Sequence, residues 1–78
     1  MIRCPCCNCL TIDDSIYPIT TVCEVCYWQY DETCQENPDI SIGPNKVSLN
    51  DARKNYKAFK ASEYRFIEFV RKPYANEI

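Results

Sequence analysis

Apolar residues follow two different spacings along the chain, and each spacing predicts a different kind of element. In the N-terminal half, short β-branched runs at 10–12 and 19–22 lie on either side of a polar turn that Pro18 closes. Strand-forming residues separated by such a turn predict a small β-hairpin. The polar segment 31–45 holds the only glycine, Gly43, and predicts a long loop.

Helical spacing dominates the C-terminal half. Ser48 is a favourable N-cap, and Asp51 three residues later can complete a capping box. A second helix is expected over about 62–71, ending before Pro73, because proline stops helices. The apolar stripe of the first helix consists of Leu49, Ala52, Tyr56 and Phe59, and the expected buried face of the second consists of Phe66, Phe69 and Val70.

The length and the cysteine content show what such a fold would need. A chain of 78 residues forms a small core, which rarely stabilises a fold by more than about 3–5 kcal/mol unaided. The chain has seven cysteines, an odd number, and no histidine. Its N-terminus lacks the apolar stretch of a signal peptide or membrane span, so we expect a cytoplasmic protein. In a reducing compartment such cysteines favour metal binding or catalysis over disulfides.

Two pairs of cysteines have the spacing of a zinc site. Cys4 and Cys7 form one CxxC turn, Cys23 and Cys26 form another, and fifteen residues separate these two knuckles. Cysteines at i and i+3 can direct both sulfurs at one ion, and four thiolates supply the tetrahedral shell that structural Zn²⁺ prefers. The sequence therefore predicts a structural zinc site with these four cysteines as ligands.

A competing pair, Cys6 and Cys9, has the same spacing as Cys4 and Cys7. Pro5 favours the first frame, because it fixes φ inside the turn and lacks an N–H that the turn does not need. The residue after such a turn often needs a positive φ, which Asn8 adopts more readily than the leucine that follows Cys9. We expect Cys6 and Cys9 to be bystanders, and Cys34 to be a spare thiol in the polar loop.

Other uses of the same sulfurs stay open. Four cysteines can also hold an iron–sulfur cluster, and the pairs could instead form disulfides or act as a redox dithiol. Four thiolates close the shell of a metal, and no histidine is present to serve as a base or to activate a nucleophilic cysteine. We therefore expect a protein that is not an enzyme.

A series of short motifs runs in order along nearly the whole chain. They are "CPCC" at 4–7, "CEVCYW" at 23–28, Asp31, Gly43, Asn45, "VSL" at 47–49, "ARxNYxxF" at 52–59, "RF" at 65–66 and "VRKP" at 70–73. With these motifs the sequence resembles the bacterial cysteine-rich CPCC family of small proteins. The resemblance implies a zinc-ribbon-type fold and no particular reaction, and for some relatives it suggests a role as immunity proteins that neutralise bacterial toxins.

The chain departs from the family pattern at single positions. The family tends to have glycine where Asn8 and Lys60 stand, proline in place of Glu24, and acidic residues in place of Gln29 and Tyr30. We expect the lysine at position 60 to smooth the break between the two helices.

Together these patterns predict a small α+β fold that forms a single domain over 1–78. A zinc-ribbon-like half with knuckles and a short hairpin would span 1–30, an acidic loop 31–47, and a helical half with two α-helices 48–72. Trp28, close to the second knuckle, is expected to pack between that knuckle and the helix face formed by Leu49, Tyr56 and Phe59.

Charge is distributed unevenly over the two halves. The net charge is −2, but residues 1–45 carry seven acids and one base, whereas residues 46–78 carry eight bases and four acids. Acidic side chains can attract a basic partner, and tyrosines are common anchors in interfaces. The candidate interface residues are Tyr30, Asp31, Glu32, Glu36 and Asp39, with Tyr17 as a further exposed aromatic.

These features favour a non-catalytic, zinc-binding module that binds a protein, most concretely an inhibitor or immunity protein covering the basic cleft of a bacterial toxin. One alternative is a redox-sensing dithiol protein that uses Cys6, Cys9 or Cys34. The other is a nucleic-acid-binding zinc ribbon, but a chain with pI about 5.0 makes nucleic acid the less favoured partner. The residues that would contact nucleic acid form a basic stripe on the first helix, namely Arg53, Lys54, Lys57 and Lys60. The sequence indicates neither a membrane partner nor an oligomeric state.

Overall fold

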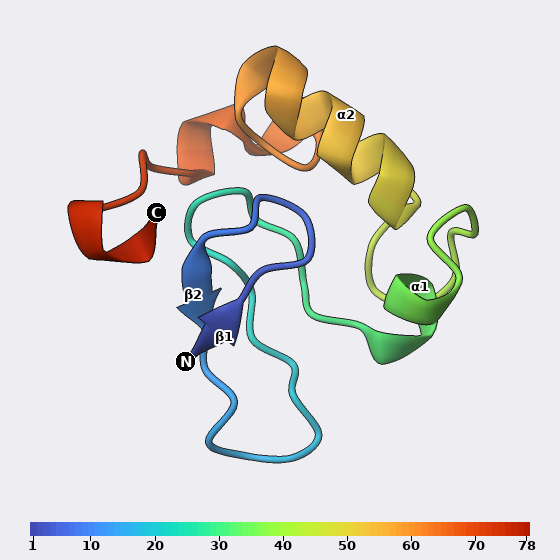
Figure 1. Cartoon of the computed structure of the whole chain (residues 1–78). Coiled ribbons are helices and arrows are strands. Elements are labelled where there is room, and N and C mark those ends of the chain that lie inside the picture. The colour runs from blue at the N-terminus through green and yellow to red at the C-terminus, as the bar shows by residue number, and fades with distance from the viewer.

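A computed structural model describes all of residues 1–78. The molecule is flat, with extents of 31 × 30 × 16 Å, and α2 (Leu49–Phe59) lies over the loops of the N-terminal half, 1–30 (Figure 1). The C-terminal segment lies on the opposite side from α1 (Glu32–Glu36) (Figure 1). The longest helix, α2, has 11 residues, and no helix is both long and apolar enough to cross a membrane. The elements are β1 (Ile2–Arg3), β2 (Leu10–Ile12), α1 (Glu32–Glu36), α2 (Leu49–Phe59) and the 3-10 helices η1 (Tyr64–Phe69) and η2 (Ala75–Glu77).

The two strands form an antiparallel hairpin whose connection is the first knuckle. Ile2 pairs with Ile12, and Arg3 pairs with Leu10 across an irregularity in the register. The expected pairing of 10–12 with 19–22 is therefore wrong, and only Val22 forms an isolated bridge, to Gln29. The hydrogen-bonded backbone of the knuckle brings the flanking residues together, since Cys4 donates its N–H to the carbonyl of Cys9, and this favours the pairing across 4–9 over the one across the polar turn 13–18.

Helix α2 begins as the sequence predicts. The Ser48 hydroxyl accepts the backbone N–H of Asp51 at 3.1 Å, which is one half of the expected capping box. The helix ends at Phe59, and the next residue, Lys60, is its C-cap with a left-handed φ of 64°. The expectation that Lys60 smooths the break is wrong, because a residue in this conformation terminates the helix and turns the chain back.

The predicted second α-helix over 62–71 does not form. The backbone N–H of Ser62 donates to the carbonyl of Cys26 at 2.7 Å, and that of Arg71 donates to the carbonyl of Glu24 at 3.2 Å. The segment is thus tied to the second knuckle at both ends, and its middle forms the 3-10 helix η1. The expected buried face is also wrong, because η1 buries no residue and Phe69 is 61% exposed.

The acidic segment 31–47 is not entirely a loop, because it contains α1. The Asp31 carboxylate caps this helix by accepting the backbone N–H of Thr33 at 3.1 Å and that of Cys34 at 3.5 Å. Cys34 is fully buried, and its thiol donates to the carbonyl of Ile42 at 2.8 Å. It is therefore a core residue rather than a spare thiol in a polar loop.

The core lies between the two knuckles and the buried face of α2. Trp28 is fully buried in the same cluster as Leu49 and Ala52, and Tyr56 packs at the margin. Phe59 lies outside this cluster and places its ring 5.5 Å from that of Tyr64 instead. The expected packing of Trp28 on α2 is therefore confirmed for the first two turns of that helix, and not for its end at Phe59. The cluster also contains six of the seven cysteines, namely Cys4, Cys6, Cys9, Cys23, Cys26 and Cys34.

Candidate metal centre

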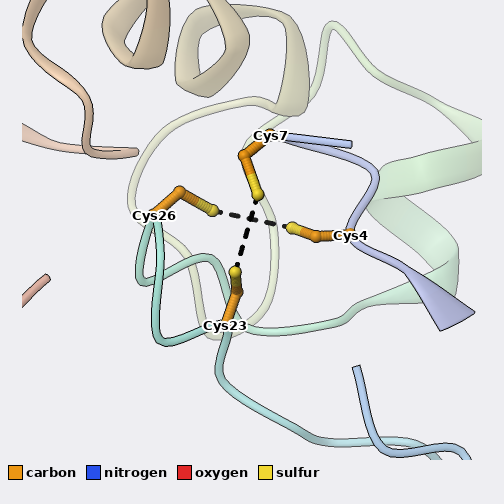
Figure 2. Close-up of side chains that lie close together, drawn as sticks. All are labelled: Cys4, Cys7, Cys23 and Cys26. Atoms are coloured by element: carbon orange, nitrogen blue, oxygen red, sulfur yellow. Dashed lines mark hydrogen bonds between the residues drawn. The ribbon is translucent and has the colours of Figure 1, made fainter. Parts of the chain in front are cut away.

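The first knuckle is a closed turn held by two backbone hydrogen bonds. Asn8 donates its N–H to the carbonyl of Cys4 at 2.8 Å, and Cys4 donates to the carbonyl of Cys9 at 2.8 Å. Asn8 adopts φ 63°, as expected for the residue after such a turn. This left-handed residue reverses the chain so that the sulfurs of Cys4 and Cys7 are on the same side (Figure 2).

The second knuckle repeats this geometry with different residues. Tyr27 donates its N–H to the carbonyl of Cys23 at 2.7 Å, and Cys23 donates to the carbonyl of Trp28 at 2.9 Å. Tyr27 adopts φ 69°, although a bulky aromatic is unusual in this conformation. Its ring lies 4.6 Å from that of Phe66 and 5.8 Å from that of Phe69, so aromatic contacts with η1 offset the backbone cost.

The two knuckles bring four sulfurs to one point. The Sγ atoms of Cys4, Cys7, Cys23 and Cys26 all lie within 4.8 Å of one another. The Cys4–Cys26 and Cys7–Cys23 sulfur pairs are each 3.6 Å apart, and the four side chains point at a common centre (Figure 2). All seven cysteines of the chain are free thiols, with no disulfide. This group of four sulfurs, the sulfur quartet, can bind a metal ion.

The protonation of the quartet explains why a cation suits it. The pKa of Cys23 is held below its ordinary value, chiefly by a hydrogen bond from Cys26 and further by bonds from Cys4, Cys7 and Thr11. The pKa values of Cys4, Cys7 and Cys26 are raised, in each case chiefly by the hydrogen bond with Cys23. The quartet without a cation therefore resists losing all four protons, and a positive ion makes four thiolates stable together.

Thr11 is the residue beside the quartet that the sequence analysis missed. Its hydroxyl oxygen lies 2.9 Å from Cys23 Sγ, and the backbone N–H of Val25 donates to the same sulfur at 3.4 Å. Thr11 is 7% exposed and lies on β2. The hairpin places it there, so the wrong strand pairing concealed its role.

The remaining predicted site residues lie away from the quartet. Cys6 and Cys9 are both buried but do not belong to it, and Cys9 donates weakly to the carbonyl of Cys7 at 3.8 Å. Tyr30, Asp31 and Glu32 line a cavity of about 580 Å³ together with the 17–20 and 42–44 segments.

Two further acids of the expected interface do not line this cavity. Glu36 is exposed on α1, and Asp39 accepts the side-chain N–H of Asn50 at 2.7 Å. The structure thus brings three of the five expected interface residues to one surface and leaves two beside it.

The two knuckles bring four cysteines together, and the chain has no histidine. These features define a small cysteine-rich protein with a candidate metal centre. The model of the family described as "Cysteine-rich CPCC" matches residues 2–77, and the chain belongs to this family. Comparisons with curated proteins and with solved structures gave no match. The family and the quartet together suggest metal binding.

Proposed function

We propose that the sulfur quartet binds one structural Zn²⁺ and that the folded chain is a non-catalytic, zinc-ribbon-like module for binding a protein. The observation that carries the metal assignment is the spacing of the sulfurs. A tetrahedral zinc with bonds of about 2.3 Å to sulfur separates its ligands by about 3.8 Å. The two measured sulfur pairs, at 3.6 Å, are close to this separation.

The same spacing favours a single ion over an iron–sulfur cluster. A cluster places several irons and sulfides between the cysteine ligands, and it therefore needs them further apart than one ion does. All four sulfurs here lie within 4.8 Å of one another. Thiolate ligands in a closed tetrahedral shell are typical of structural zinc, which keeps no open position for a substrate. This supports a stabilising role for the metal and a chain without enzymatic activity.

The position of the quartet also supports a structural role. The second knuckle accepts backbone hydrogen bonds from Ser62 and Arg71, and its neighbour Trp28 is fully buried in the core. An ion at the quartet would therefore join the hairpin, the core and the C-terminal segment. Small domains of this length often need such a contribution, because their apolar core alone stabilises them only weakly.

The surface around α1 supports a protein partner with a basic face. Tyr17 is 81% exposed and Ile42 is 54% exposed beside the cavity that Tyr30, Asp31 and Glu32 line. Glu32 and Glu36 form no salt bridge within the chain, so their charges are available to a partner. Apolar anchors surrounded by acids match a basic cleft, such as that of a bacterial nuclease toxin, and an inhibitor or immunity role is the most specific form of this proposal.

Native mass spectrometry with and without a strong chelator tests the metal assignment. We expect one zinc per folded chain and loss of near-UV circular dichroism when the chelator removes it. A chain that folds without metal, or that binds iron with the absorbance of a cluster, contradicts the zinc assignment. The result does not depend on whether a partner is known.

Pull-down assays with the products of neighbouring genes test the proposed partner. We expect one of them to bind, and we expect the double charge reversal Glu32→Lys with Glu36→Lys to weaken binding by at least about tenfold. The control Glu68→Lys reverses an exposed charge on η1, away from this surface, and should bind normally. Equal binding by the unmodified chain, the double variant and the control variant contradicts a role of the acidic surface in binding. Failure of every neighbouring gene product to bind contradicts the immunity role.

A further inference from the structure

Hydrogen-bond donors are distributed unevenly over the sulfur quartet. Cys23 Sγ accepts the Val25 N–H at 3.4 Å and lies 2.9 Å from the Thr11 hydroxyl, which can donate to a thiolate there and which is 3.4 Å from its other acceptor, the carbonyl of Cys9. The sulfurs of Cys4, Cys7 and Cys26 contact other sulfurs but receive no N–H or O–H donor. A thiolate that accepts hydrogen bonds is stabilised as the anion, and its lone pairs are less available for reaction. Cys23 is therefore the least nucleophilic member of the quartet.

Exposure to solvent separates the other three cysteine residues. Cys4 is 1% exposed and Cys26 is fully buried, whereas Cys7 is only half-buried. Cys7 borders an open cavity of about 490 Å³ between the first knuckle and α2. Cys7 is thus the one residue of the quartet that is partly exposed and whose sulfur also has no N–H or O–H donor.

The cavity beside Cys7 is positively charged. Arg53 and Lys57 line it, and no acidic residue does. The Arg53 guanidinium is fixed over the knuckle because its Nε donates to the carbonyl of Pro5 at 2.9 Å. Lys57 forms no salt bridge. These two cations favour the approach of small anionic reagents to a centre that would itself be negative.

We propose that Cys7 is the modification site of the metal centre, where small oxidants of the peroxide class and anionic electrophiles react first. This inference depends on the proposed zinc site. In the reaction with hydrogen peroxide, the Cys7 thiolate attacks one peroxide oxygen, a sulfur–oxygen bond forms and the oxygen–oxygen bond breaks. The sulfur is oxidised to sulfenic acid, and the peroxide is reduced to hydroxide, which a solvent proton converts to water.

Oxidation at Cys7 has a direct consequence for the metal. A sulfenic acid lacks the charge of a thiolate and is a poor ligand for zinc, which prefers anionic sulfur. The ion then has three thiolate ligands instead of four, and it dissociates more readily. Cys7 would therefore make metal retention, and with it the folded state, sensitive to oxidants.

Competitive labelling of the zinc-loaded full chain tests this inference. Zinc content is measured first; a chain without zinc contradicts the proposed function itself. The loaded chain then receives limiting iodoacetamide at neutral pH, and peptide mass spectrometry locates the first label among the four ligands. We expect Cys7 to react at least about tenfold faster than Cys23, the change typical of one charge-assisted hydrogen bond. A zinc-loaded chain that is labelled first at Cys4, Cys23 or Cys26 overturns this inference alone.

Two further measurements test the oxidant and the charge. After limiting hydrogen peroxide, a sulfenic-acid probe should mark Cys7, and zinc should be released in proportion; release without a mark there contradicts the proposal. Lys57→Gln should lower the ratio of the iodoacetate rate to the iodoacetamide rate at Cys7 by about twofold to threefold. The control Lys54→Gln removes a neighbouring charge that does not line the cavity and should leave the ratio unchanged. If the iodoacetate-to-iodoacetamide rate ratio at Cys7 is the same in Lys57→Gln and Lys54→Gln, the charge of Lys57 does not attract anionic reagents to this site.

Discussion

Asn8 and Tyr27 occupy equivalent positions in the two knuckles. Each follows the second cysteine of its pair, with φ 63° and 69°, and each donates its N–H to the carbonyl of the first cysteine, at 2.8 and 2.7 Å. Asparagine is suited to this conformation, whereas a tyrosine tolerates it only with compensation. The left-handed residue of the second knuckle therefore depends on aromatic contacts with η1 for compensation, and that of the first does not need them.

Replacing Tyr27 tests this dependence. Tyr27→Asn keeps a residue suited to the left-handed backbone but removes the ring that contacts Phe66 and Phe69. We expect a loss of about 1–2 kcal/mol in the free energy of unfolding, because each aromatic pair contributes about 0.5–1.5 kcal/mol. Urea denaturation of the metal-loaded protein measures this loss. Unchanged or increased stability would mean that the aromatic contacts do not compensate the backbone.

At position 60, a substitution that suits the left-handed backbone should stabilise the fold relative to one that does not. Lys60 adopts φ 64° at the end of α2, and its ammonium lies 5.4 Å from the centre of the Tyr56 ring. Lys60→Gly and Lys60→Ala both remove the ammonium, but only glycine relieves the left-handed backbone. We expect the glycine variant to be more stable than the alanine variant by about 1 kcal/mol in the free energy of unfolding. If alanine is as stable as glycine, position 60 carries no backbone strain.

Trp28 should determine whether the core forms. It is fully buried, and its indole N–H has no hydrogen-bond partner. Trp28→Ala should cost about 3–5 kcal/mol in the free energy of unfolding, which is comparable to the whole stability of a small domain. Trp28→Phe should cost much less, because it removes volume but no hydrogen bond.

Unfolding followed by circular dichroism in the presence of zinc measures the free energy of unfolding of both Trp28 variants. Tyr17→Ala, at an 81% exposed position, is the control. A folded, fully stable Trp28→Ala variant would show that the cysteine centre holds the chain without this core.

Thr11 should affect the affinity for metal. Thr11→Val keeps the shape of the side chain but removes the hydroxyl 2.9 Å from Cys23 Sγ. Outer partners of metal ligands typically change affinity by 10-fold to 100-fold, so we expect a weakening of about this size. Thr11→Ser keeps the hydroxyl and should bind nearly as well as the natural chain. Competition with a chelator of known affinity measures the difference, and equal binding by Thr11→Val would show that the hydroxyl does not support the sulfur.

Metal binding should strengthen as the pH rises. The pKa values of Cys4, Cys7 and Cys26 are raised in the metal-free quartet, so these three thiols carry protons at neutral pH. The pKa of Cys23 is lowered, so its sulfur loses its proton before the other three do. Binding one cation to four thiolates releases at least three protons, and acid therefore favours the metal-free chain.

The logarithm of the affinity should rise by at least about three per pH unit between about pH 5 and 7. Competition titrations at several pH values measure this slope. A slope of about four would mean that Cys23 is also protonated in the metal-free chain, and a slope below about two would contradict a shell of four thiolates.

Local backbone preferences are what the sequence analysis predicted well. Pro5 and Asn8 favoured the frame in which Cys4 and Cys7 share a knuckle, and the structure places these two sulfurs in the quartet. Ser48 predicted the start of α2 through its hydroxyl. Each of these features depends on residues within a few positions, so the sequence contains the whole cause.

Features that depend on distant contacts were predicted poorly. The segment 10–12 has strand-forming residues, but its partner is chosen by the knuckle, so the sequence pattern could not indicate Ile2 and Arg3. The 62–71 segment has a helical pattern, but hydrogen bonds to the carbonyls of Cys26 and Glu24 override it. Helix α1 is too short to show a period, and the buried state of Cys34 was missed with it.

The hydrogen bonds from Ser62 and Arg71 to the second knuckle have a consequence for the life of the protein in a cell. If zinc holds the quartet, as proposed, withdrawal of the ion loosens the carbonyls of Cys26 and Glu24, and the 62–78 segment loses these two hydrogen bonds to the second knuckle. Cellular proteases cut such loosened segments readily. The abundance of this chain should therefore follow the supply of its metal, and starvation for zinc should clear it without any change in its synthesis.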